Sequence, residues 1–157
     1  MKILFVADIF AQPGRRVAAA LIPALVREHE IDLVIANGEN AAGGFGITAA
    51  LAEDLFDCGA DVITTGNHIW DQREVVTYLV REPRLLRPVN YPPDSTPGNG
   101  AGVFETQRGH KVLVVNVMGR LFMDPLDDPF VAIEAALDGH ELGAGIDAAI
   151  FDVHGEA

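Results

Sequence analysis

The sequence predicts an α/β protein whose sheet begins with parallel strands. Short apolar runs of strand length alternate with longer runs that have helical periodicity. The strand runs are nearly continuous in apolar residues, which is typical of parallel strands buried on both faces. The 157 residues are enough for one domain. With 49% hydrophobic and 22% charged residues, the chain can bury a core.

The first half of the chain alternates strands with helices. Pro13 and Gly14 open the first helix, since proline suits the first helical turn. Thr48 is positioned to cap the second helix. The expected elements are a strand at 2–7, buried on both faces, a helix from 13 to about 29, a strand at 31–36, a helix at 49–58, a strand at 61–65 and a helix from 71 to about 81.

The second half predicts antiparallel strands and one more parallel unit. Residues 83–102 carry five prolines and three glycines and are expected to form a long surface connection. Runs at 101–106 and 111–117 predict a hairpin turned at Arg108-Gly109. An acidic loop at 123–129 leads to a helix from about 130 to 137 and then to a last strand at 147–153.

Composition excludes several classes of partner. The net charge of −12, from 23 acidic and 11 basic residues, argues against binding a nucleic acid duplex, which requires clustered Lys and Arg. No run approaches the ~20 apolar residues that cross a bilayer, so we expect no membrane partner. Cys58 is the single cysteine, so no internal disulfide forms, which fits a cytoplasmic location. The sequence leaves the oligomeric state open, and a homo-oligomer is compatible with it.

Polar side chains with oxygen or nitrogen donors follow almost every predicted strand. Open α/β sheets place ligands beyond the carboxyl ends of their strands. Each residue alone has a plainer reading as a solvated carboxylate, a cap or a turn. Together they would bring two carboxylates to one sheet edge, which is costly unless a cation or a proton offsets the charge. The residues at these ends are Asp8, Glu39, Asn40, Asn67, His68, Asn116 and His154.

This donor set suggests a metal site without thiolates. A single cysteine excludes a zinc site built from cysteine clusters. Mixed oxygen and imidazole ligands suit Fe, Mn, Zn or Mg. We expect two divalent or trivalent ions, with Fe or Mn ahead of Mg or Zn. A carboxylate such as Glu39 can bridge two ions about 3.5–4 Å apart, a pair that holds a phosphoryl group and activates water.

A set of spaced motifs resembles the calcineurin-like metallophosphoesterases, and more narrowly their YmdB-like branch of cyclic-nucleotide phosphodiesterases. The resemblance covers essentially the whole chain and implies a layered α/β/β/α sandwich. The pair Asn-Gly-Glu-Asn-Ala-Ala and Gly-Asn-His-x-Trp-Asp is its most specific part. The motifs are Asp8, Asn37-Gly-Glu-Asn-Ala-Ala42, Gly44-Phe-Gly-Ile-Thr48, Gly66-Asn-His-Ile-Trp-Asp71 and Asp152-Val-His-Gly-Glu156.

The resemblance implies a role for each metal-site residue. Asp8 would ligate one ion and Glu39 would bridge both. Asn40 would be a ligand or a close partner of one. Asn67 and His154 would ligate the second ion.

The resemblance also implies that His68 is a catalytic residue and not a ligand. It would donate a proton to the leaving oxygen while metal-bound hydroxide attacks phosphorus in line. A pKa in the neutral range suits histidine to this task. The implied activity is a metal-dependent phosphodiesterase acting on small phosphoesters, foremost 2′,3′-cyclic nucleotides.

Departures from the wider pattern refine this assignment. Phe10 stands where the superfamily has histidine, and Glu39 where it has aspartate. Both are usual in the YmdB-like branch, whereas Gly155 replaces a more frequent alanine. The family continues into a Gly-x-His-x-His motif that supplies two more histidine ligands, and this chain ends before it.

We therefore expect a single metallophosphoesterase domain at 1–157 that is the amino-terminal part of a longer enzyme, with the sandwich incomplete at its carboxyl end. Weak metal binding and little activity are expected for this stretch alone. The alternative is a non-catalytic metal- or nucleotide-binding regulatory protein on the same scaffold.

Weaker candidates surround the predicted site. Arg15 and Arg16 are candidates for a phosphate contact, although a solvated pair is the simpler reading. The glycines at 43–46 let backbone amides approach a phosphate, without the lysine of a P-loop. Phe45 and Trp70 are candidates for stacking on a base, with core packing preferred for Trp70.

Overall fold

The α/β class is confirmed. The computed structural model describes residues 1–93, 95–123 and 125–155, so Asp124 of the acidic loop and Glu156 of the last motif lie outside the described residues. In chain order the elements are β1 (Ile3–Val6), α1 (Ala11–His29), β2 (Leu33–Asn37), α2 (Ala49–Asp57), β3 (Val62–Thr64), the 3-10 helix η1 (Asn67–Trp70), α3 (Val75–Leu79), β4 (Ala101–Glu105), β5 (Lys111–Met118), α4 (Pro129–Leu137) and β6 (Ala148–His154).

Two sheets of three strands each organise the described chain. The first has the order β1-β2-β3 and is parallel throughout. In the second, β4 and β5 form the predicted antiparallel hairpin, and β6 adds in parallel to β5. Both the parallel start and the antiparallel hairpin are confirmed.

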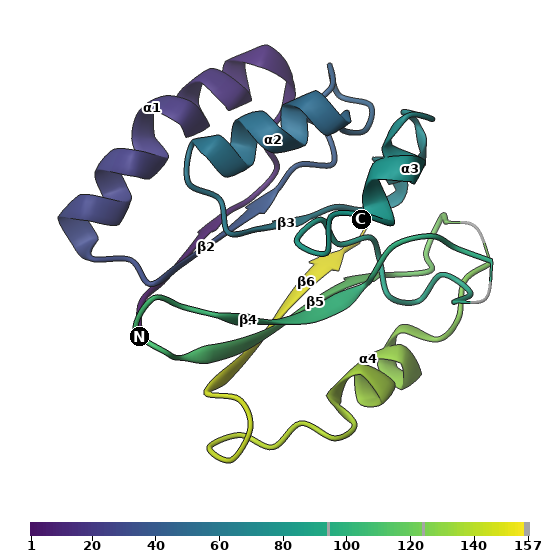
Figure 1. Ribbon diagram of the computed structural model, residues 1–157. Coiled ribbons are helices and arrows are strands. Elements are labelled where there is room, and N and C mark those ends of the chain that lie inside the picture. Colours follow the sequence, from purple (N-terminus) through teal and green to yellow (C-terminus); the bar gives the residue numbers. More distant parts are fainter. Residues whose placement is uncertain (94, 124, 156–157) are drawn as a thin grey trace.

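The layers follow the predicted α/β/β/α order. Figure 1 shows α1 and α2 over one face of the first sheet, the second sheet against its other face, and α4 beyond the second sheet. Each pair of layers encloses its own apolar cluster. Ile22 and Leu55 pack with Ile63 under the helices, whereas Ile35 and Val114 meet between the sheets. A third cluster joins β5 to α4.

The first strand differs from the prediction. β1 pairs with β2 and with no other described strand, so it lies at the sheet edge. Phe5 is 42% exposed, and burial on both faces is found in β2 instead. An apolar run reports strand character but does not reveal whether a neighbouring strand covers its outer edge.

The helix predicted from 71 to about 81 is wrong in its first half. The chain winds into the 3-10 helix η1 straight after Gly66, and only Val75–Leu79 is α-helical. The Asp71 N–H donates to the His68 carbonyl at 3.0 Å, and the Asp71 carboxylate contacts the His68 ring instead of capping a helix. Side-chain pairing within the turn therefore overrides the helical propensity of the sequence.

The stretch 83–102 is only partly a surface connection. Leu85 and Leu86 are completely buried, and the Leu86 N–H donates to the Ile63 carbonyl at 2.8 Å, alongside β3. Arg87 is 5% exposed and donates to backbone carbonyls, including that of Pro88 at 2.8 Å. The prolines and glycines thus shape a segment that is half interior.

Among the described residues, no helix combines the length and the apolar character needed to cross a membrane.

Candidate metal centre and active site

The predicted residues meet at the carboxyl ends of the strands. A pocket of about 320 Å³ opens there, because β1, β2 and β6 all run toward the same edge of the sandwich. Five of the six predicted site residues line it, and the sixth, Asn67, directly precedes a lining residue. The lining residues are Ala7, Asp8, Asn37, Glu39, Asn40, His68, Asp152, Val153, His154 and Gly155.

Glu39 and His154 form the buried part of this site. Glu39 is 5% exposed, and His154 Nδ1 lies 2.8 Å from Glu39 Oε1. The Glu39 N–H donates to Asn37 Oδ1 at 3.2 Å, so the residue that ends β2 fixes the backbone of Glu39. One carboxylate and one imidazole from different sheets are thereby held together.

Gly66 is required by the close approach of these two side chains. A methyl group at Gly66 would lie 2.5 Å from His154 Nδ1 and would also overlap Glu39 Oε2. Gly66 has a φ of −155°, outside the left-handed region, so the constraint that the structure shows is the space for a side chain.

Asp8 and Asn40 form the exposed part. Asn40 Nδ2 donates to Asp8 Oδ1 at 2.8 Å. Asp8 has a φ of 43°, a left-handed conformation that aspartate tolerates better than most residues. Its strand ends in this turn, which carries the carboxylate to the pocket.

His68 is oriented by a residue to which the sequence analysis gave no role. His68 Nδ1 lies 2.6 Å from Asp71 Oδ2, and the His68 side chain is 32% exposed at the pocket. Since an ionised carboxylate only accepts, Nδ1 carries the shared proton. The sequence does contain a signal for this pairing. His68 and Asp71 are three residues apart, and side chains at this spacing lie above one another in a 3-10 helix.

Two asparagines link the sheets at the pocket, one in its wall and one buried outside its lining. Asn37 Nδ2 donates to Asp152 Oδ2 at 3.0 Å. Asn116, fully buried in β5, accepts from the Thr65 N–H at 3.1 Å and donates to the Asp152 carbonyl at 3.3 Å. Asn116 was predicted at this edge, but it does not line the pocket. It contacts Thr65, which lies two residues before Asn67, and Asp152, which lies two residues before His154.

The donors at the pocket fit a metal ion in their chemistry. Within the described part of the chain, Glu39 Oε2 and Asn67 Oδ1 are buried without a hydrogen-bond partner. Buried polar atoms are normally satisfied, so an unsatisfied carboxylate oxygen on Glu39, whose other oxygen meets His154, suits a hard cation. No group of three or more His, Cys, Asp or Glu side chains among the described residues is arranged to hold an ion. The donors form two partial sets, one around Glu39 and one around Asp8.

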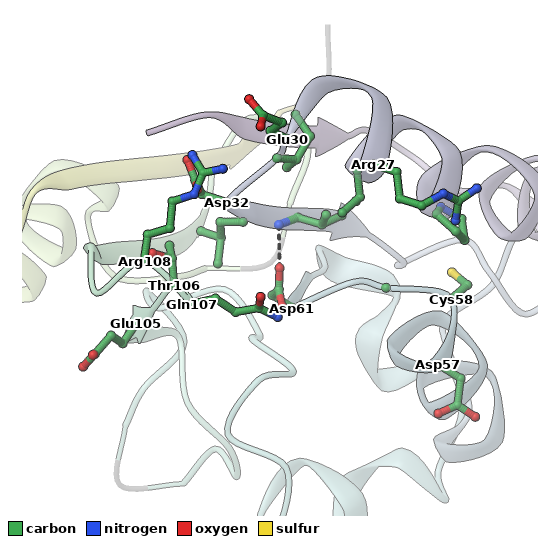
Figure 2. A pocket seen from close by; sticks show the side chains of 16 residues that line it. Arg27, Glu30, Asp32, Asp57, Cys58, Asp61, Glu105, Thr106, Gln107 and Arg108 are labelled. Atoms are coloured by element: carbon green, nitrogen blue, oxygen red, sulfur yellow. Dashed lines mark hydrogen bonds and ion pairs between the residues drawn. The ribbon is translucent and has the colours of Figure 1, made fainter.

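A larger pocket lies at the opposite end of the strands. It has a volume of about 540 Å³ and is built from the end of α1, the turn before β3 and the β4–β5 turn (Figure 2). Asp61 accepts there from the Val34 N–H at 2.7 Å, the contact drawn in Figure 2. None of the predicted site residues lines this pocket. The strand-end pocket is therefore identified by its donors and not by its size.

Relatives of the chain include one curated enzyme. The chain is 41% identical over 131 residues to a 2′,3′-cyclic-nucleotide 2′-phosphodiesterase of Bacillus subtilis, a match that covers 83% of this chain and 49% of the relative. The chain thus spans about half the length of that relative.

Two crystal structures share the fold. A hypothetical protein from Thermus thermophilus superimposes with a TM-score of 0.88 at 43% identity, covering 100% of this chain and 59% of that one. A phosphatase from Mycoplasma pneumoniae gives a TM-score of 0.86 at 28% identity, with 100% and 56% covered. The family model described as YmdB-like protein matches residues 4–157. The chain therefore belongs to the YmdB-like family.

Proposed function

We propose that this chain carries the phosphate-handling site of a metal-dependent phosphodiesterase for small phosphoesters, with 2′,3′-cyclic nucleotides as the preferred substrates. The observation that carries the proposal is the strand-end pocket, where Glu39 and His154 are in contact and Glu39 Oε2 is buried without a partner among the described residues. The name of the Bacillus subtilis relative supports the choice of substrate.

The metal-holding residues would be Asp8, Glu39, Asn40, Asn67 and His154. Glu39 is the residue most suited to be shared between two ions, because one of its carboxylate oxygens meets His154 and the other has no hydrogen-bond partner among the described residues. Bound ions would supply neutralisation of the phosphoryl charge and a lowered pKa for water.

Asn40 and Asn37 hold the carboxylate of Asp8 and the backbone of Glu39 in place. Asn40 holds one oxygen of Asp8 through its amide, which leaves the other oxygen for a ligand. Asn37 accepts from the Glu39 N–H and donates to Asp152, and so ties the Glu39 backbone to β6. Such fixed supports reduce the reorganisation that a reaction would otherwise require.

His68 is the proposed proton donor. Asp71 accepts from Nδ1, so Nε2 is the nitrogen left to give a proton to the leaving oxygen. The Asp71 carboxylate also stabilises the charged imidazolium. His68 is partly exposed at the pocket, where a substrate can reach it.

The proposal is tested with three proteins: a full-length homologue of the family and its two variants that correspond to His68→Ala and Glu39→Gln. Each is supplied with Mn²⁺, and hydrolysis of 2′,3′-cyclic AMP is measured together with bound metal. We expect His68→Ala to lose roughly 10²- to 10⁴-fold in rate with its metal content retained. Glu39→Gln is expected to lose metal and activity together.

Normal turnover by His68→Ala would refute its role as the acid. Binding of nucleotide or metal without turnover, in the unaltered homologue, would favour the alternative of a non-catalytic binding protein. This alternative is motivated by the arrangement of the metal-donor side chains. Among the described residues they form two partial sets, one around Asp8 and one around Glu39, and not one complete set.

A further inference from the structure

We propose that Phe45 determines substrate specificity, by taking a flat aromatic group, such as a nucleobase, at the rim of the strand-end pocket. This inference rests on the proposed function, because it assumes that the phosphoryl group binds in that pocket.

Phe45 is an apolar side chain kept at the surface beside a catalytic candidate. It is 62% exposed. Its ring centroid lies 5.8 Å from that of His68, with the two rings at 89°. The two rings meet at right angles, and at this exposure much of the Phe45 ring stays open to solvent. An exposed aromatic face next to a polar pocket is the usual arrangement for stacking a base.

The backbone that carries Phe45 is fixed. Gln72 Nε2 donates to the Phe45 carbonyl at 2.7 Å, and the Ala42 N–H donates to the Gly46 carbonyl at 2.8 Å. Gly46 has a φ of 81°, and a methyl group there would lie 2.7 Å from the His68 carbonyl oxygen. The turn at residues 43–46, called the glycine turn below, is therefore packed directly against η1. The ring of Phe45 is held at a set position relative to His68.

A second exposed ring borders the same glycine turn. Phe10 is 56% exposed and lies over Gly44, where a methyl group would be 2.9 Å from the phenyl ring. Phe10 follows Asp8 by two residues, whereas Phe45 contacts His68. Both rings thus border the same turn, and of the two only Phe45 has a ring contact with a residue that lines the pocket among the described interactions.

Exposure alone does not mark such a site. Phe122 and Phe130 are 82% and 76% exposed, more than Phe45. Neither lines the strand-end pocket or has a ring contact with one of its residues among the described interactions. The contact with His68 is what singles out Phe45, and Phe130 on α4 provides a matched control.

The test compares two five-membered cyclic phosphodiesters that differ only in the base. These are 2′,3′-cyclic AMP and the 2,3-cyclic phosphate of methyl riboside. Phe45→Ala should raise the KM for the nucleotide at least about fivefold, the low end of the range for loss of one base stack. The KM for the methyl riboside and both kcat values should change less than about twofold. Phe45→Tyr should retain the preference, and Phe130→Ala should leave all values unchanged.

A second readout does not depend on turnover. Dissociation constants of both compounds are measured by NMR without added metal, and Phe45→Ala should weaken only the nucleotide. If a full-length homologue hydrolyses neither compound while this selective weakening is seen in the chain, the proposed function fails and the role of Phe45 stands. Equal effects of Phe45→Ala on both compounds, no effect on either, or no binding of the nucleotide to the unaltered chain would overturn the inference.

Discussion

Glu39 shows how much of the site depends on single contacts. Its carboxylate is buried, one oxygen meets His154, and the other has no hydrogen-bond partner among the described residues. Burial of a carboxylate oxygen without a hydrogen-bond partner is costly, so the groups around Glu39 must offset that cost. The neighbouring backbone of Gly66 approaches so closely that no side chain fits between them.

Gly66→Ala is predicted to disrupt the site. The added methyl group would overlap Glu39 Oε2 and contact His154, so one of these side chains must move. We expect at least about a tenfold loss of Mn²⁺ affinity, because misplaced ligands and their supports typically cost this much. Isothermal titration with Mn²⁺ measures the affinity.

Gly155→Ala is the matched control for that substitution. Gly155 lines the same pocket, but a methyl group there meets nothing within 4 Å. It should bind Mn²⁺ as the unaltered chain does. If both alanine variants weaken binding equally, crowding at Gly66 is not the cause.

The residues of the site were predictable to different degrees. Asp8, Glu39, His68 and His154 were placed together because parallel strands end at a common edge, and sequence motifs mark those ends. The hydrogen bonds that Asn37 and Asn116 make across the two sheets, to Asp152 and from the Thr65 N–H, were not predicted. An asparagine in a strand gives no local signal of a partner that arrives from another sheet more than thirty positions away.

At the scale of elements, α2 connects the glycine turn to the core. Thr48 follows that turn and accepts from the Leu51 N–H at 3.2 Å, which caps the helix as predicted. Behind the cap, Ala52 and Leu55 are buried against the first sheet. The position of the glycine turn thus depends on the stability of the first turn of α2.

Thr48→Ala is predicted to lower the free energy of unfolding by about 1 kcal/mol, the usual cost of losing an N-cap side chain. Thr48→Ser keeps an oxygen at the same place and should recover most of the loss. Urea unfolding followed by circular dichroism measures both. A Thr48→Ser variant as unstable as Thr48→Ala would show that the methyl group, and not the cap, matters.

Elements with local signals were predicted well. α1, α2 and the β4–β5 hairpin follow from periodicity, a cap and a glycine turn. The start of the helix expected from residue 71 was wrong because of a local pairing, that of His68 with Asp71, whereas two other errors concern elements decided by distant neighbours. β1 is an edge strand because of what pairs with it, and Leu85 and Leu86 are buried because β3 lies beside them. Sequence patterns do not encode such pairings directly.

At the scale of the whole molecule, the two sheets are joined at both ends of the strands. At the carboxyl ends, Asn37 and Asn116 bridge them through Asp152 and Thr65. At the amino ends, Asp32 performs a similar task. It accepts from the Lys2 N–H at 2.7 Å and lies 3.2 Å from Arg108 Nε, which belongs to the β4–β5 turn. Asp32 and Arg108 line the larger pocket together (Figure 2).

This arrangement makes stability depend on pH through Asp32. The backbone hydrogen bond from Lys2, aided by the charge of Arg108, holds the pKa of the Asp32 carboxyl below its ordinary value of 3.8. A lowered folded-state pKa means that ionised Asp32 stabilises the fold above pH 3.8. That contribution is lost as the pH falls through the lower pKa of the folded state.

Asp32→Asn should therefore be less stable than the unaltered chain at about pH 7, and the difference should shrink as the pH falls below 3.8 and through the lowered pKa of the folded state, where Asp32 becomes neutral. Urea unfolding at a series of pH values measures the difference. Glu28→Gln, which alters an exposed carboxylate of α1, serves as the control for the change in net charge. A destabilisation by Asp32→Asn that stays the same at both ends of this range would mean that shape, and not ionisation, governs the contribution of Asp32. The junction of the two sheets at their amino ends would then rest on neutral hydrogen bonds alone.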